Sequence, residues 1–232
     1  MYQNHRILMY KEHSILSESE LIDFLYDVMI SLCKTSSFMC MAPVYECKYK
    51  RNSDKFNWNK ESFKKYMGKN HSTINNQIIG YSLSFFSDLN EDNSCNITVS
   101  ISCSEKKFSV FDLQLSYNIC STFYEDKQIC NELKESFVNL VEMFDPFYAC
   151  IKNDKNISGK LFDDISLIPT HLHWINYLSN RKYLNLSLKS CQLLLIQEIN
   201  NGRLVCFGEK PIDVLDEDRI AEQKYLWAFR TR

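Results

Sequence analysis

The sequence predicts an α+β fold: a single antiparallel β-sheet, made of a meander plus a C-terminal hairpin, with helices packed against it. Two long segments repeat apolar residues at helical spacing, and several shorter segments alternate apolar and polar residues. The first pattern is typical of amphipathic helices, and the second of strands with one buried and one exposed face. The links between the alternating segments are short and polar. Antiparallel neighbours need only such links, whereas parallel strands need long crossovers.

The clearest helix is expected from Ser17 to about Lys34. Ser17 and Glu20 form a capping box, in which a hydroxyl and a carboxylate satisfy free amides of the first turn. Apolar residues then share one face of the helix: Leu21, Phe24, Leu25, Val28, Met29 and Leu32. Before this helix, the segment from Arg6 to Tyr10 is predicted to be a short edge strand.

The region from residue 48 to residue 77 is basic, rich in Asn and dotted with aromatic residues. Between Lys48 and Lys69, eight side chains are basic and two are acidic. We expect a short helix from Asn59 to Met67 and a loop from His71 to Gln77.

Three strands are expected next, because apolar residues take alternate positions in residues 81–85, 97–103 and 111–119. Their connections, residues 87–96 and 105–107, are short. These segments therefore predict the antiparallel meander.

A second long helix is expected from about Asp126 to Phe144. Asp145-Pro146 ends it, because the residue before a proline is disfavoured in the helical conformation. An irregular segment follows. Residues 191–198 and 203–207 are then predicted to form a hairpin around Asn200-Asn201-Gly202, since Asn-Gly tolerates the positive φ angles of tight turns. A last helix is expected from Asp216 to about Phe229, and residues 1–232 are expected to form one domain.

Composition and charge indicate the cellular compartment and argue against a secreted or membrane-spanning protein. The formal charge is −2, and the N-terminus lacks the apolar run of a secretion signal. No apolar stretch is long enough to span a membrane. Ten cysteines are present without a Cys-x-x-Cys pair, so we expect a cytoplasmic protein with reduced thiols used as small core residues.

No catalytic motif stands out, so the sequence predicts no enzymatic activity, no cofactor and no metal. His171 and His173 could place two imidazoles together, but two ligands are too few for a metal site. Asp163-Asp164 are paired carboxylates without a third partner, and Asp is also a preferred cap residue. Phosphate-binding and nucleophile motifs with glycine are absent from the sequence.

Two segments carry a resemblance to a known family. They are Phe144-Asp-Pro-Phe-Tyr148 and the stretch Pro169-Thr-His-Leu-His-Trp-Ile-Asn-Tyr-Leu-Ser179, followed by the hairpin at Asn201-Gly202. In these residues, and in the order helix, meander, helix, the chain resembles the immunity protein 52 family of bacterial polymorphic toxin systems. The resemblance implies a cytoplasmic antitoxin that binds a cognate toxin delivered by contact-dependent or type VI-like secretion. A nuclease effector is the implied target, blocked stoichiometrically and without catalysis.

Candidate toxin-binding residues follow from the chemistry of tight interfaces. Exposed aromatic side chains are frequent anchors, and complementary charge speeds association. The candidates are Trp58 and Tyr66 in the basic region, and the acidic Asp213, Asp216, Glu217 and Asp218 near the C-terminus. His173, Trp174 and Tyr177 are expected in the core.

Two other functions remain open from the sequence. One is a nucleic-acid-binding module that uses the basic and aromatic residues 48–69, although the slightly acidic chain as a whole makes a nucleic-acid partner unexpected. The other is a small hydrolase with an unrecognised Cys or Asp site.

Overall fold

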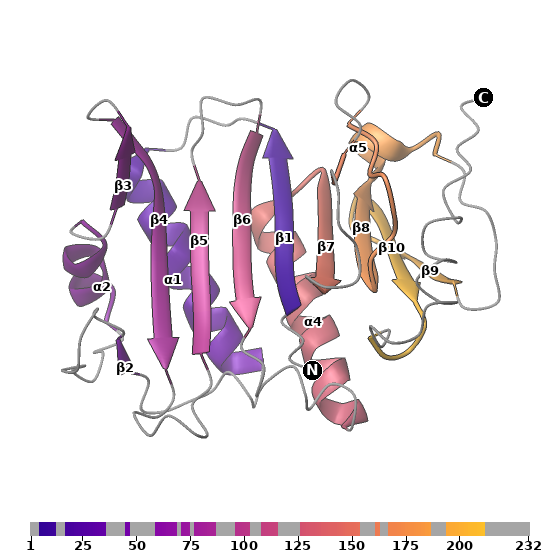
Figure 1. Ribbon diagram of the computed structural model, residues 1–232, viewed down its shortest axis with the longest axis horizontal. Coiled ribbons are helices and arrows are strands. Elements are labelled where there is room, and N and C mark those ends of the chain that lie inside the picture. Colours follow the sequence, from indigo (N-terminus) through magenta and orange to yellow (C-terminus); the bar gives the residue numbers. More distant parts are fainter. Residues whose placement is uncertain are drawn as a thin grey trace.

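A computed structural model describes residues 5–12, 17–35, 45–46, 59–68, 71–74, 77–86, 96–102, 108–115, 126–153, 161–162, 167–186 and 194–211. Within these residues, ten strands form one antiparallel sheet with helices packed against it (Figure 1). The predicted α+β fold with a single antiparallel sheet is confirmed.

The strands are β1 (His5–Glu12), β2 (Tyr45–Glu46), β3 (His71–Ile74), β4 (Gln77–Phe86), β5 (Asn96–Ser102), β6 (Phe108–Leu115), β7 (Tyr148–Asn153), β8 (Ile175–Ser179), β9 (Leu194–Ile199) and β10 (Gly202–Phe207). The helices are α1 (Glu18–Thr35), α2 (Lys60–Met67), α4 (Lys127–Phe144) and α5 (Asn180–Tyr183). Across the sheet the strand order is β2-β4-β5-β6-β1-β7-β8-β10-β9, and β3 also pairs with β4. The predicted meander is therefore β4-β5-β6.

The helix ends follow the residues that predict them. At α1, the Ser17 amide donates to the Glu20 carboxylate at 2.7 Å, and the Glu20 amide donates to the Ser17 hydroxyl at 3.3 Å, which confirms the capping box. The Asn59 side chain accepts from Ser62 and caps α2. Asp126 caps α4, and Asp145 ends it with φ 50° and ψ 58°.

The sheet has a buried core on each face. Helices α1 and α4 cover one face (Figure 1), where Ile7, Met9 and Phe111 pack among helix residues such as Leu25 and Phe137. On the opposite face, a second core covers β1, β7, β8 and β10. It consists of Leu8, Phe147, Tyr148, Cys150, Leu172, Leu178, Tyr183, Leu186, Val205 and Phe207.

The expectation of an edge strand from Arg6 to Tyr10 is wrong. β1 is a central strand that pairs with both β6 and β7. Ile7, Leu8 and Met9 are buried in succession, because their side chains enter the two cores on opposite faces. A short continuous apolar run of this kind is consistent with a fully buried strand.

Two further expectations need correction. The loop predicted from His71 to Gln77 contains β3, which pairs with β4 through a register shift between Ser72 and Thr73. The segment predicted to be irregular contains β7 and β8, which pair with each other. Every residue of β8 is buried, so this strand lacks the alternation that would have marked it in the sequence.

The predicted hairpin is confirmed, but Gly202 is not the residue that takes the positive φ angle of its turn. The two loop residues are Asn200 and Asn201, and Asn200 takes the positive φ of 47°. Gly202 lies in β10, where a Cβ atom would come within 2.6 Å of the Leu178 carbonyl oxygen and of the Tyr177 ring. Gly202 is therefore required for close approach to β8.

Candidate interaction surface

The two edges of the sheet are built differently. At one end, the outer edge of β4 is covered by β2 and β3. At the other end, β9 pairs with β10 alone among the described strands. Leu195 and Ile196 of β9 are 57% and 49% exposed. Edge strands with neighbouring exposed apolar residues are uncommon, because they invite pairing with other chains.

The register with β10 determines which way each β9 side chain faces. Leu195 lies opposite Cys206, and Gln197 lies opposite Leu204. Since Leu204 and Cys206 belong to the core beneath the helices, Leu195 and Gln197 face the side of α4. Ile196 and Glu198 face the other side.

A groove of about 780 Å³ runs between α4 and the β9–β10 hairpin. Its lining combines apolar residues of the hairpin with mostly polar residues of the helix: Leu195, Ile196, Gln197, Leu204, Cys206, Lys134, Glu135, Val138 and Asn139. Burial raises the pKa of the Cys206 thiol, so this part of the floor is uncharged at neutral pH. An apolar floor with a polar rim is typical of protein interfaces. We call this groove together with β9 the β9 edge surface.

The position of α4 beside this groove is fixed at one end by the residues after β10. Lys134 donates to the Glu209 carbonyl oxygen at 2.9 Å, and Lys127 lies 3.4 Å from the Glu209 carboxylate. The Lys134 ammonium also lies 5.8 Å from the centre of the Trp174 ring. These contacts hold the helix wall of the groove in place relative to its floor.

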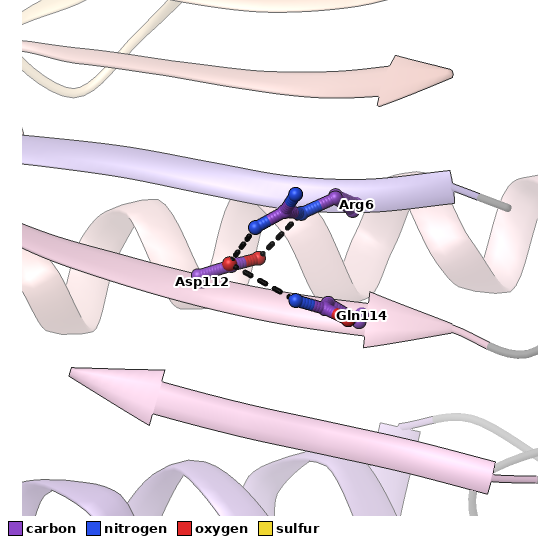
Figure 2. Close-up of polar contacts among 3 residues, drawn as sticks. All are labelled: Arg6, Asp112 and Gln114. Carbon is purple, nitrogen blue, oxygen red and sulfur yellow. Dashed lines mark hydrogen bonds and ion pairs between the residues drawn. The ribbon is translucent and has the colours of Figure 1, made fainter. Parts of the chain in front are cut away.

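A polar cluster occupies the sheet face opposite the helices. Figure 2 shows Arg6 of β1 reaching Asp112 of β6, with Gln114 on the other side of the carboxylate. The Arg6 Nε donates to Asp112 Oδ1 at 3.1 Å, a second guanidinium nitrogen contacts Oδ2, and Gln114 donates to Oδ2 at 3.4 Å. The arginine and aspartate charges compensate each other. The cluster fixes polar groups on this face but presents no apolar anchor.

The two histidines noted in the sequence lie just before β8. The ring centres of His171 and His173 are 4.5 Å apart, and both residues are buried. Burial, followed by the neighbouring His171, holds the pKa of His173 well below its usual range. Asn176 accepts from the His173 amide and donates to the His173 carbonyl oxygen, and Tyr148 donates to the Asn176 side chain. In the described part of the chain, no three His, Cys, Asp or Glu residues are grouped to hold a metal ion.

Most predicted toxin-binding residues lie outside the described residues: Trp58, Asp213, Asp216, Glu217 and Asp218. The Asp163-Asp164 pair and the helix predicted from Asp216 also lie outside them. Tyr66 is described: it lies in α2 and packs half-buried against the core.

Two lysines of the basic region contact another helix. Lys60 and Lys64 of α2 form ion pairs with Asp23 of α1 at 3.2 and 2.9 Å. Hydrogen bonding from Lys64 lowers the pKa of the Asp23 carboxyl. Phe63 and Met67 on the same helix are fully buried. The described part of the basic region thus docks α2 on α1.

The β9 edge surface was not among the sequence-based candidates. The hairpin was predicted, but a hairpin strand can be central or peripheral. One local pattern indicates the surface: Leu195 and Ile196 are consecutive apolar residues, so the strand presents an apolar side chain on each of its faces.

No protein-family model matches this chain, and no curated protein matches it either. None of the described helices is long and apolar enough to cross a membrane.

Proposed function

We propose that this protein is a cytoplasmic immunity protein that binds a cognate bacterial toxin, a nuclease effector, and blocks its active site stoichiometrically. The observation that carries the proposal is the β9 edge surface, where Leu195 and Ile196 are exposed beside an apolar groove. Exposed apolar residues beside a groove with a polar rim mark protein-binding sites, and here Leu195 faces the groove while Ile196 presents an apolar side chain on the other side of the same strand. The resemblance to immunity proteins supplies the class of partner.

Occlusion requires affinity rather than chemistry from this chain. Leu195 and Leu204 provide apolar contact area in the groove. Glu135 and Glu198 add negative charge at its rim and on β9, beside the Lys134 ammonium, which donates to the Glu209 carbonyl oxygen. Nucleases present basic surfaces to nucleic-acid phosphates, so acidic side chains next to apolar anchors suit such a target. An antitoxin must outlast the toxin, and affinity among related complexes is determined mostly by slow dissociation.

The test is co-expression with the product of a toxin-like gene next to this one. We expect the wild-type protein to restore growth and to co-purify with the toxin at a fixed ratio. Leu195→Asp places a charge at the interface and is expected to weaken binding at least about 30-fold, corresponding to the roughly 2 kcal/mol of an interface hot spot. Leu184→Asp is the matched control, because Leu184 is 67% exposed and lies outside the β9 edge surface.

Both variants must unfold at the wild-type temperature for the comparison to hold. Absence of rescue and of any complex with the wild-type protein would contradict the proposed function. Equal loss of binding in the Leu195 and Leu184 variants would show that the β9 edge surface is not the toxin-binding site.

A further inference from the structure

We propose that the partner binds by strand addition, with an extended segment of the toxin pairing along the edge of β9 that faces away from β10, which no described strand occupies. This inference rests on the proposed function and specifies the chemistry of the bound segment. The segment would continue the sheet by one strand and would place alternate side chains in the groove beside α4.

The backbone of β9 is arranged for such pairing. Asn200 and Asn201 form a two-residue hairpin loop, so Ile199 and Gly202 are the pair that closes it. The closing pair of such a hairpin is hydrogen-bonded, and in an antiparallel ladder these pairs alternate with non-bonded ones. The backbone N–H and C=O groups of Leu194, Ile196 and Glu198 therefore point away from β10, toward an added strand.

The side chains next to this edge define the sequence of the partner segment. Leu195, Leu204 and Cys206 form apolar floor on the α4 side, so partner residues pointing there should be apolar. On the other side, Glu198 is exposed. Arg203 lies opposite it on β10 and donates to the carbonyl oxygens of Tyr183 and Leu186 at 2.6 and 3.0 Å. A lysine or arginine opposite Glu198 would complete a cross-strand pair. The expected segment alternates apolar with polar or basic residues.

Charge also argues against a second copy of this chain as the occupant. β9 has the sequence Leu-Leu-Ile-Gln-Glu-Ile, with one acidic residue and no basic one. Two copies paired symmetrically about Gln197 would place each Glu198 opposite Ile196 of the other copy. Neither carboxylate would then gain a cationic partner. A strand from a different protein that carries a basic residue would pair with the outward backbone groups of β9 and would also give Glu198 a cationic partner.

The decisive experiment compares two substitutions at Ile196 in the purified complex. Ile196→Ala removes most of the exposed apolar side chain and keeps the outward N–H. Ile196→Pro also removes that N–H, and proline is tolerated at edge positions whose N–H faces solvent. Strand addition predicts that the Pro variant binds the toxin at least about 10-fold more weakly than the Ala variant, since an edge hydrogen bond is lost and pairing is obstructed.

Amide hydrogen exchange provides a measurement that needs no variant. In the complex with wild-type protein, we expect amide exchange at Ile196 and Glu198 to slow at least about 10-fold, because a bonded amide exchanges only when the added strand opens. Exchange at the amides of Asn131 and Glu142, on α4 outside the groove lining, should change little. No slowing at Ile196 and Glu198 in a formed complex would overturn strand addition.

The outcomes separate the two proposals. Formation of a wild-type complex that the Pro and Ala variants form equally well would retain the proposed function and overturn strand addition. Failure of the wild-type protein to form any complex would overturn the proposed function, and strand addition with it. A dimer of the free protein that Ile196→Pro dissolves would identify a second copy as the occupant and would also overturn the proposal.

Discussion

The two ends of the sheet differ in how their outermost strands are paired. At the β4 end, β2 and β3 pair along the outer side, and α2 lies near them (Figure 1). At the β9 end, the outermost described strand exposes Leu195 and Ile196, with a groove beside it. The described chain thus covers one edge of the sheet with its own strands and leaves the other paired on one side alone. Under the proposed function, the β9 edge, which no described strand covers, is where the partner binds.

The largest expected effect is a loss of stability on substitution of one glycine near each edge of the sheet. These glycines are Gly202 in β10 and Gly80 in β4. A Cβ at Gly202 would lie 2.6 Å from the Leu178 carbonyl oxygen, and one at Gly80 would lie 2.5 Å from the Ile101 carbonyl oxygen. Because backbone atoms cannot move aside easily, Gly202→Ala and Gly80→Ala should each lower the free energy of unfolding by about 3 kcal/mol. Denaturant unfolding measures this loss.

The same pair of variants tests the functional difference between the edges. After correction for the unfolded fraction, Gly202→Ala should weaken toxin binding, because it displaces β10 and with it β9. Gly80→Ala should bind as the wild type does. Gly68→Ala is the control, since the nearest atom to its Cβ would be 3.6 Å away and its φ is helical. A neutral Gly202→Ala variant would show that β10 can shift without strain.

Acid is expected to destabilise the sheet through its buried histidines. Burial lowers the pKa of His5 to about 4 and that of His173 well below its usual range. Both side chains are therefore neutral when folded but protonated when unfolded below about pH 6.5, so stability is lost as the pH falls. His5 alone should contribute a loss of about 3 kcal/mol between pH 6.5 and 4.

Unfolding measured from pH 7.5 to 4 checks this prediction. His5→Phe should flatten the dependence, because the aromatic volume remains and the titrating group is gone. Since His5 lies in central β1 and His173 beside β8, exchange data along the titration would show which part of the sheet opens first. An unchanged slope in the His5 variant would contradict the prediction.

The smallest effect is expected at the covered edge. The Asn59 side chain accepts from the Ser62 amide at 2.8 Å and caps α2. Asn59→Ala should lower the free energy of unfolding by about 1 kcal/mol, the usual contribution of such a cap. Toxin binding should be unaffected. Thermal unfolding and the binding assay together test this, and reduced binding in a folded Asn59→Ala variant would place function at the α2 end instead.

Local sequence patterns were sufficient where the structure depends on neighbours along the chain. The capping box at Ser17 and the helix end at Asp145 come from groups within one turn of each other. The alternation in β4, β5 and β6 is a property of one strand with one polar face. These elements were predicted from the sequence and are confirmed.

Tertiary structure alone decided the features that depend on pairing. β1 is central because β6 and β7, far apart in the sequence, both pair with it. β8 is buried on both faces and so shows no alternation, and Gly202 is required by Tyr177 and Leu178 rather than by its own turn. The sequence by itself determined the α+β class, the long helices, the meander and the hairpin. Which strand edge is covered and which remains open was decided only by the fold, because strand neighbours are chosen by contacts between distant residues and not by local spacing.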